Sequence, residues 1–193
     1  MQSTAKNNEV FIHPMALVET SDIGAGTKVW AFAQVMSGAH IGSNCNIGGH
    51  AFVEAGALLG SRVTLKNQVM VWNGVTIEDD VFVGPGVVFT NDLKPRSPRM
   101  PAAAERYSAP SNWLGQTRIG RGASIGAGSV ILPVNVGSHS MIAAGSVVTK
   151  DVPPHALMKG NPARVSGWVC FCGSKLDEHR ACSTCKKIIT LPE

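Results

Sequence analysis

The sequence predicts an all-β fold, a parallel β-helix of six-residue repeats, and three observations support this prediction. Large apolar residues recur at every sixth position over most of the chain. A small or β-branched residue usually stands four places further on, and glycine often follows the apolar residue directly. Six is a multiple of the two-residue period of a strand and fits no helical period, so short strands separated by tight corners are expected.

The repeat begins at Phe11 and runs without interruption for fourteen positions. After a gap it resumes at Ile119, and it loses one residue between Ile131 and Val136 before it ends at Val148. These 20 positions are expected to point inward and to stack, which suits a chain with 21 glycines and only 6% aromatic residues. The predicted inward positions are Phe11, Leu17, Ile23, Val29, Val35, Ile41, Ile47, Val53, Leu59, Leu65, Val71, Ile77, Val83, Phe89, Ile119, Ile125, Ile131, Val136, Ile142 and Val148.

This repeat, an aliphatic residue followed by Gly and then by Ser, Thr, Ala or Val, resembles that of the hexapeptide acyltransferases. The resemblance implies a left-handed helix with three repeats per turn and assembly as a homotrimer, and 20 repeats then make between six and seven turns. We expect a flexible N-terminus at 1–9, the β-helix domain at 10–151, an exit segment at 152–168 and a separate tail at 169–193.

The repeat stops where a proline- and arginine-rich excursion, residues 94–117, leaves a corner of the helix. Long loops inside compact domains are usually functional. The segment that leads into it, from Phe89 to Ser97, reads FTNDLKPRS and resembles N-acetyltransferases acting on nucleotide-linked 3-amino sugars. The resemblance implies transfer of acetyl from acetyl-CoA to the amine of a UDP- or dTDP-linked amino sugar. Surface polysaccharide, including lipopolysaccharide, or glycoside biosynthesis is the implied setting.

The same resemblance implies that Asn91 lies close to the attacking amine. Asp92 is a second catalytic candidate, and for both residues the alternative is turn initiation, since Asn and Asp bond their own backbone in loops. Arg96 is expected to bind the diphosphate with its guanidinium fork or to remain solvated. The predicted substrate-binding residues are Glu54, Lys66, Asn67 and Arg96.

Acetyl-CoA is expected along the outside of the late turns, where the resemblance places the pantetheine against backbone groups. Lys150 and Arg164 would bind its phosphates or remain simple surface charges. The turn at Pro162 resembles the motif with which the family leaves the helix beside adenine. The predicted cofactor-binding residues are Gly126, Ala144, Gly145, Lys150, Pro162 and Arg164.

No histidine stands in an obvious catalytic constellation, although the chain has six. A sugar amine with a pKa near 8 is ~20% neutral at about pH 7.4, so a side-chain base is not required. Positioning of the amine then dominates the rate enhancement. The thioester sulfur is expected to collect the proton as it leaves.

The tail holds four of the five cysteines, Cys170, Cys172, Cys182 and Cys185. A CxC pair followed nine residues later by CxxC can supply four thiolates to one structural zinc ion. The CxC spacing, and Lys186 where such turns often have Gly, argue against zinc.

Composition narrows the alternatives. A scattered net charge of +4 does not indicate a nucleic-acid partner, and no apolar run or leader indicates a membrane, so we expect a cytoplasmic protein.

Three alternative functions stay open. A sugar or serine O-acetyltransferase of the same fold would need a histidine–carboxylate pair. An enzyme of the carbonic anhydrase type would need three converging histidines. A β-helix that serves only assembly or binding is the non-enzymatic alternative.

Overall fold

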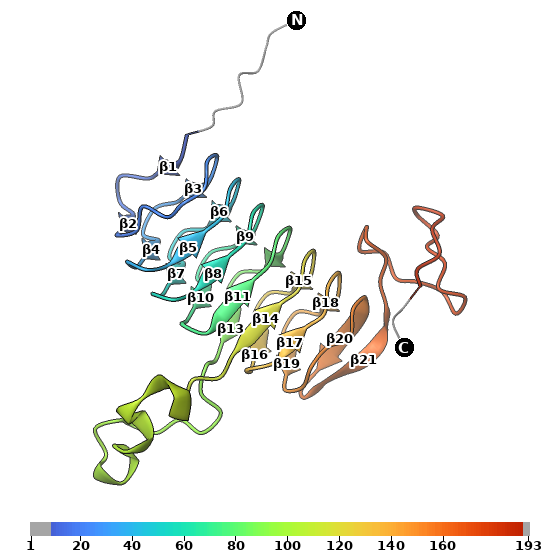
Figure 1. Cartoon of the computed structure of the whole chain (residues 1–193). Coiled ribbons are helices and arrows are strands. Elements are labelled where there is room, and N and C mark those ends of the chain that lie inside the picture. Colours follow the sequence, from blue (N-terminus) through green and yellow to red (C-terminus); the bar gives the residue numbers. More distant parts are fainter. Residues whose placement is uncertain (1–8, 191–193) are drawn as a thin grey trace, which may run out of the picture.

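The computed structural model describes residues 9–190 and consists almost entirely of short strands stacked in successive turns (Figure 1). The predicted flexible N-terminus lies outside the described residues except for Glu9. Three sheets form the three sides of the helix, and every strand pairs in parallel with the strand one turn away, except β21. The predicted parallel β-helix is therefore confirmed. Among residues 9–190 no helix has the length and apolar character that crossing a membrane requires.

The three sheets are here named A, B and C, and the chain visits them in that order. Sheet A contains β1 (Phe11–Ile12), β3 (Lys28–Val29), β6 (Asn46–Ile47), β9 (Thr64–Leu65), β12 (Phe82–Val83), β15 (Ser124–Ile125), β18 (Met141–Ile142), β20 (Ala156–Gly160) and β21 (Ala163–Trp168). Sheet B contains β2 (Leu17–Val18), β4 (Gln34–Val35), β7 (Phe52–Val53), β10 (Met70–Val71), β13 (Val88–Phe89), β16 (Val130–Ile131) and β19 (Val147–Val148). Sheet C contains β5 (His40–Ile41), β8 (Leu58–Leu59), β11 (Val75–Ile77), β14 (Thr117–Ile119) and β17 (Asn135–Val136).

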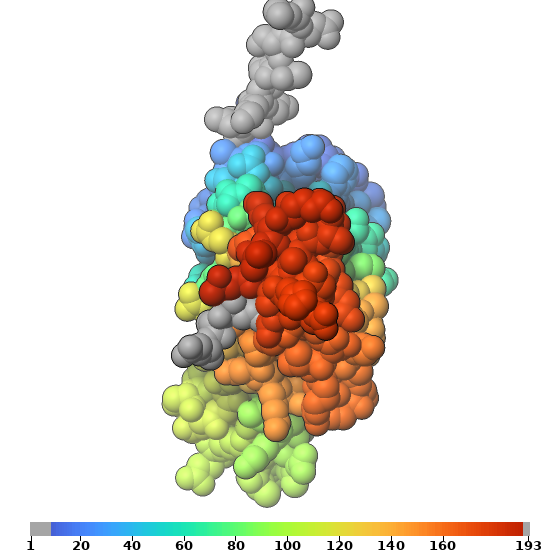
Figure 2. Space-filling model, turned by 90° about the vertical axis from the view of Figure 1, so that its right-hand side faces the viewer, coloured from blue at the N-terminus to red at the C-terminus, as the bar shows by residue number. Residues whose placement is uncertain are grey.

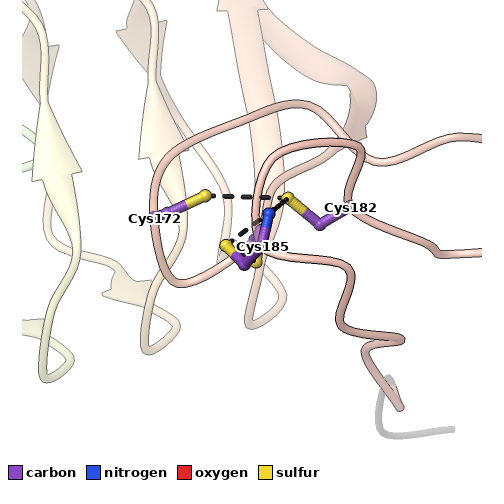
Figure 3. Close-up of side chains that lie close together, drawn as sticks. Cys172, Cys182 and Cys185 are labelled. Atoms are coloured by element: carbon purple, nitrogen blue, oxygen red, sulfur yellow. Dashed lines mark hydrogen bonds between the residues drawn. The ribbon is translucent and has the colours of Figure 1, made fainter.

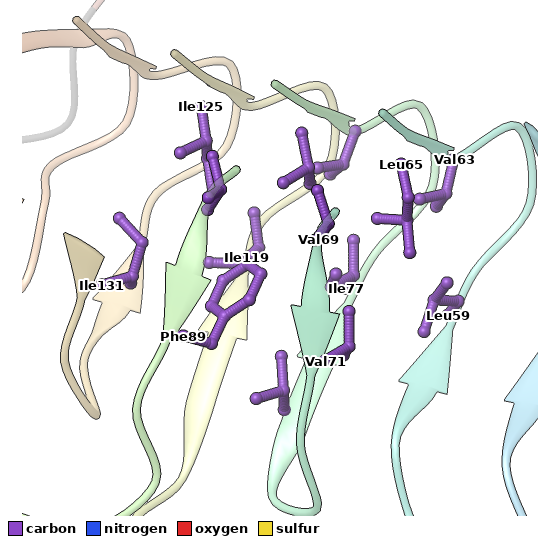
Figure 4. Packing of buried hydrophobic residues seen from close by; sticks show 14 of the residues in the cluster. Leu59, Val63, Leu65, Val69, Val71, Ile77, Phe89, Ile119, Ile125 and Ile131 are labelled. Carbon is purple, nitrogen blue, oxygen red and sulfur yellow. The ribbon is translucent and has the colours of Figure 1, made fainter. Parts of the chain in front are cut away.

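The core is a column of buried side chains from the strands and the corners between them, nearly all aliphatic, with Phe89 as an aromatic member (Figure 4). From Val29 onward the predicted inward positions are buried, and the small residues four places later, such as Ala33 and Cys45, are buried beside them. Burial of so many aliphatic side chains, at ~1.5 to 3 kcal/mol each, stabilises a helix that has almost no aromatic core.

Two of the three predicted inward positions of the first turn, Phe11 and Leu17, are wrong, whereas Ile23 does face inward and pairs with Ile41. Strand pairing sets Ile12 against Val29 and Val18 against Val35, so Phe11 and Leu17 point outward and are 44% and 52% exposed. The step from Val18 to the inward Ile23 has five residues instead of six. A slip of one residue reverses which face each side chain occupies, and here it falls where both neighbouring residues are apolar.

The helix also continues past the last predicted position. Val152 pairs with Val136 and Met158 pairs with Ile142, and both are buried. The step from Val148 to Val152 has four residues, so a six-residue period does not identify Val152 as an inward position. Eight of the nine strands of sheet A are parallel, all but β21, and each belongs to one turn of the helix. The helix therefore has eight turns, whereas the repeat count predicted between six and seven.

Each turn has three corners, here called AB, BC and CA after the sheets that they join. The excursion replaces one BC corner between β13 and β14 and contains three short 3₁₀ helices, η1 (Pro101–Ala103), η2 (Arg106–Ser108) and η3 (Pro110–Asn112). In Figure 1 it projects from the lower edge of the helix, while the cysteine-containing tail lies at the far right.

Candidate active site

Asn91 lies at the neck of the excursion, directly after β13. Its backbone carbonyl accepts a hydrogen bond from the Gly115 nitrogen at 2.8 Å, which closes the neck. Its side-chain Nδ2 donates to the Asn73 carbonyl oxygen at 3.3 Å, one turn earlier. Asn91 is half-buried, and these two bonds fix its position on the BC corner.

Glu54 belongs to the same column of residues. Its carboxylate Oε2 accepts a hydrogen bond of 2.7 Å from the Asn73 nitrogen, and the Asn73 carbonyl in turn receives the Asn91 side chain. Three successive turns thus place Glu54, Asn73 and Asn91 one above the other on the BC corner. Asn73 was not among the predicted site residues.

Asp92 holds the excursion together. Its carboxylate accepts two hydrogen bonds from the Arg106 guanidinium, one from the Tyr107 hydroxyl at 2.7 Å and one from the Lys94 nitrogen at 2.8 Å. The Arg106 guanidinium keeps the pKa of the Asp92 carboxyl well below its usual range, against the opposite effect of burial, and the Tyr107 and Lys94 donors act in the same direction. The carboxylate is ionised, and all its hydrogen bonds are made within the excursion. We call this set of Asp92, Arg106 and Tyr107 the Asp92 clasp.

The clasp extends to the rest of the excursion through Tyr107. The Tyr107 hydroxyl accepts a hydrogen bond of 2.8 Å from the Arg96 nitrogen, and its ring packs against Trp113 at a centroid distance of 5.6 Å. The Arg96 side chain is exposed, and its Nη1 donates to the Pro95 carbonyl. The clasp therefore fixes the backbone that carries Arg96 while its guanidinium stays on the surface. The sequence gives no signal for this pairing, because Arg106 is one of three arginines in a segment without a repeat.

Lys66 and Asn67 lie on the AB corner, across sheet B from Asn91. They line a groove of about 570 Å³ together with Trp30, Gly48 and His50. A second groove, about 370 Å³, lies beside it and is lined by aromatic residues that include Phe32 and Trp72. One chain alone therefore does not bring Lys66 and Asn67 to the column that contains Glu54 and Asn91.

Four of the six predicted cofactor residues gather on the AB corner of the late turns. The Gly145 nitrogen donates to the Ala127 carbonyl at 2.9 Å, and a Cβ on Gly126 would collide with the Ala144 backbone. The Gly160 nitrogen donates to the Ser146 hydroxyl at 3.2 Å, which brings the β20–β21 hairpin tip, with its cis Asn161–Pro162 bond, to this corner. Arg164 follows the tip and is exposed. Lys150 lies apart, on the BC corner.

Sheet B separates these two corners, and its outer face is apolar. Its strands present Leu17, Gln34, Phe52, Met70, Val88, Val130 and Val147 outward. Leu17 and Val88 are 52% and 43% exposed, and only Gln34 is polar. On sheet C the corresponding residues of β5, β11, β14 and β17 are polar.

The histidines of the described chain do not converge. His40 pairs with Asp22 at 2.8 Å on the outer face of sheet C, and both side chains are largely exposed. His50 stacks on Phe32 at the AB corner, at a centroid distance of 4.9 Å. His139 and His155 stack on each other at 5.2 Å on the CA corner, under the tail. Three converging histidines are thus not found among residues 9–190.

The four cysteines of the tail do converge. Their sulfur atoms all lie within 4.8 Å of one another, and Figure 3 shows those of Cys172, Cys182 and Cys185 pointing toward one another. All four thiols are free of disulfide bonds. This cluster lies beyond β21 at the C-terminal end of the helix, whereas the excursion leaves the helix midway, between β13 and β14 (Figure 1).

Known families match the repeats of the helix. The family described as bacterial transferase hexapeptide (six repeats) matches residues 20–55, and the one described as hexapeptide repeat of succinyl-transferase matches 53–91 and 116–150. The interval between the last two matched ranges, 92–115, contains most of the excursion.

Individual relatives extend the likeness. The dTDP-3-amino-3,6-dideoxy-alpha-D-galactopyranose 3-N-acetyltransferase of Aneurinibacillus thermoaerophilus is 46% identical over 187 residues, 95% of this chain and 92% of that protein. The bifunctional protein GlmU of Acidithiobacillus ferrooxidans is 30% identical over 81% of this chain, which spans only 30% of GlmU. The solved acetyltransferase domain of PglB from Neisseria gonorrhoeae superposes with a TM-score of 0.53 at 25% identity, over 82% of this chain and 58% of that one.

Proposed function

Because the chain belongs to the family of hexapeptide-repeat transferases, and within it resembles amino-sugar N-acetyltransferases, we propose that it acetylates the amine of a nucleotide-linked amino sugar with acetyl-CoA. The 46% identity over nearly the whole of both chains carries this proposal. The same relative supports a dTDP-linked 3-amino-3,6-dideoxyhexose as the acceptor. The product would serve surface polysaccharide or glycoside synthesis in the cytoplasm, a reducing compartment in which clustered thiols persist.

Asn91 positions the attacking amine in this reaction. Its Nδ2 is held by the Asn73 carbonyl, so its Oδ1 is the atom that accepts an N–H from the substrate amine. The nitrogen lone pair then attacks the thioester carbonyl, the N–C bond forms and the C–S bond breaks. The amine proton goes to the departing sulfur of coenzyme A, so no side-chain base is needed. Such positioning contributes up to ~7 to 11 kcal/mol when the groups are well oriented.

Asp92 and Arg96 act around this centre in different ways. Asp92 is not free to take a proton, because its carboxylate is ionised and bonded to Arg106 and Tyr107. It positions the excursion instead. Arg96 remains the candidate for the sugar nucleotide's diphosphate, since its guanidinium is exposed on a backbone that the clasp fixes.

A homotrimer completes the site. The amine-binding BC corner and the acetyl-CoA corner lie on opposite edges of sheet B, so one chain cannot join them. If the apolar face of sheet B packs against a neighbour in a closed ring, the AB corner of one chain meets the BC corner of the next. Lys66 and Asn67 then reach the acceptor from the neighbouring chain, while Lys150 stays a surface charge.

Light scattering tests the trimer. Val88→Lys, on the outer face of sheet B, is expected to give monomers, whereas Thr76→Lys, on the outer face of sheet C, is expected to leave trimers. A wild-type monomer at micromolar concentration would contradict the proposal.

One observation favours a second function. The His40–Asp22 pair is the kind of base that an O-acetyltransferase requires. It lies on sheet C, however, and its strand, β5, is two strands away from β11, the strand that follows Asn73. His40→Ala is expected to leave acetyl transfer unchanged. Loss of turnover in this variant would favour acetylation of a hydroxyl.

The acceptor assay tests the proposed function itself. Purified protein is incubated with acetyl-CoA and either dTDP-linked 3-amino sugars, UDP-linked amino sugars or the N-acetylated products, and free thiol is followed. Thiol release is expected with the dTDP-linked 3-amino sugars and not with the acetylated products. Absence of release with every amine would contradict the function.

A further inference from the structure

The tail, residues 169–190, folds around four cysteine sulfurs and very little else. Its buried cluster consists of Cys170, Leu176, Cys182 and Ile189, and two of these are the cysteines themselves. The two aliphatic side chains of this cluster, with Val169 buried where the tail joins the helix, do not suffice to order a segment of this length, because each ordered residue loses conformational entropy. Another source of stability must hold the segment together.

The sulfur geometry fits one tetrahedral metal ion. The pairs Cys170–Cys185, Cys172–Cys182 and Cys182–Cys185 are each 3.6 Å apart, and all four sulfurs lie within 4.8 Å of one another. Zinc bound at about 2.3 Å from each of four thiolates requires sulfurs roughly 3.8 Å apart. The observed separations therefore match the edges of a tetrathiolate site.

The backbone turns back after each cysteine pair, and in both turns the residue that follows the second cysteine has a positive φ. Gly173, after the first pair, has a φ of 84°, and Lys186, after the second pair, has a φ of 59°. The Gly173 nitrogen donates to the Cys170 carbonyl at 2.8 Å, and the Lys186 nitrogen donates to the Cys182 carbonyl at 2.9 Å. Lys186 thus adopts the left-handed conformation that glycine usually supplies. The Cys185 nitrogen also points at the Cys182 sulfur, at 3.4 Å, as a donor that supports a metal-bound thiolate.

Charge complements this geometry. The segment 170–190 carries Lys175, Arg180, Lys186 and Lys187 against Asp177 and Glu178, so its net charge is +2. Zinc with four thiolates carries a charge of −2, so the whole segment becomes neutral. Four protein ligands leave no open position for a substrate, so the ion would be structural.

The folded tail packs against the last turns of the helix. Phe171 contacts both stacked histidines edge-on, with centroids 4.5 Å from His139 and 4.7 Å from His155. Trp168 packs against the buried clusters of both the helix and the tail, and the Arg180 guanidinium lies 4.7 Å above its ring. Seen from this end of the molecule, the tail lies over the last turns (Figure 2).

We propose that Cys170, Cys172, Cys182 and Cys185 bind one zinc ion, and that this ion holds the tail on the C-terminal end of the β-helix. The end of a β-helix exposes the last layer of its core, and repeat proteins need such ends covered. The metal thus supplies the folding energy of a cap that has almost no core of its own.

Elemental analysis of the full chain, purified without added metal or chelator, is expected to find about one zinc per chain. Cys182→Ser is expected to lose it, and Cys45→Ala, which removes the cysteine inside the helix, to retain it. Should Cys182→Ser fail to fold, the wild-type protein still decides the question. Cobalt added to reduced, metal-free protein is expected to give the intense absorption of a tetrahedral tetrathiolate site. No bound metal together with five freely titrating thiols, or iron in place of zinc, would overturn the proposal.

Trypsin tests the capping role separately from activity. The tail has cleavage sites at Lys175, Arg180, Lys186 and Lys187, and removal of zinc is expected to speed cleavage there by at least tenfold while the helix stays intact. Phe171→Ala is expected to keep the zinc and still speed cleavage, because it removes only the contact with His139 and His155. Equal cleavage with and without zinc would show that the ion does not hold the tail.

Discussion

Two segments leave the β-helix, and they solve the same problem in different ways. Neither segment buries many apolar side chains: within the described residues, Ala103 is the buried apolar residue of the excursion, and Val169, Leu176 and Ile189 are the buried aliphatic residues of the tail. The excursion is held by an ionised clasp of Asp92, Arg106 and Tyr107, whereas the tail brings four thiols together. The excursion stands beside Asn91, where we propose that the substrate amine binds, while the tail lies at the C-terminal end of the helix (Figure 1). In both appendages a local cluster of polar or thiol groups, and not a large apolar core, brings the chain together, while the helix supplies a rigid base.

The largest expected effect is on the excursion side, at Asn91. Asn91→Ala is expected to lower turnover by one or more orders of magnitude with little change in thermal stability, because it removes a positioning contact and no core volume. Asn112→Ala, an exposed asparagine in the same excursion, is the matched control and should behave as wild type. Wild-type turnover in Asn91→Ala would reduce Asn91 to a turn-forming residue.

Breaking the clasp is expected to have the next largest effect. Arg106→Gln should lower kcat/KM for the sugar nucleotide by about tenfold, since the backbone that carries Arg96 would no longer be fixed. Arg99→Gln is the control, because Arg99 forms no ion pair among residues 9–190. Equal kinetics in the two variants would mean that the clasp has no part in substrate binding.

The clasp also has a defined pH dependence. The pKa of the Asp92 carboxyl is lowered in the folded protein from an ordinary value of 3.8, so its stabilising contribution is fully present above that value and is lost only as the pH falls toward the folded pKa. Neutral and mildly acidic solutions should therefore leave the excursion equally resistant to proteolysis. A loss of resistance between about pH 5 and 8, the range in which histidine titrates, would show that another group controls it.

The smallest effect on activity is expected from the tail. Removal of zinc should leave acetyl transfer within about twofold of wild type, because the proposed cleft is built from the AB and BC corners. Steady-state assays before and after chelation, with zinc added back, measure this. A loss of transfer that zinc restores would place the tail in the active site and remove the contrast between the two appendages.

The sequence predicts the helix well because the six-residue period records the packing directly. The prediction of inward residues fails where the spacing between successive inward residues falls below six, from Val18 to Ile23 and from Val148 to Val152. Only the strand pairing shows which residue faces inward there. The cysteine cluster was also predictable, because two closely spaced cysteine pairs can be recognised in the sequence without any repeat.

The arrangement of the site was less predictable. Glu54 and Asn91 share a corner only because steps of 19 and 18 residues, through Asn73, bring them into one column, while Lys66 and Asn67 fall on the next corner. The partner of Asp92 lies 14 residues away in a segment without periodicity, so nothing in the sequence selects Arg106 from the other arginines.

The position of the acetyl group on the product tests the central claim most directly. The acetylated sugar nucleotide is isolated after the reaction with a dTDP-linked 3-amino-3,6-dideoxyhexose and analysed by mass spectrometry and NMR. An acetyl amide on the 3-amino nitrogen, stable to mild base, is the predicted result. An ester on a hydroxyl, removed by mild base while the amine stays free, would contradict the account.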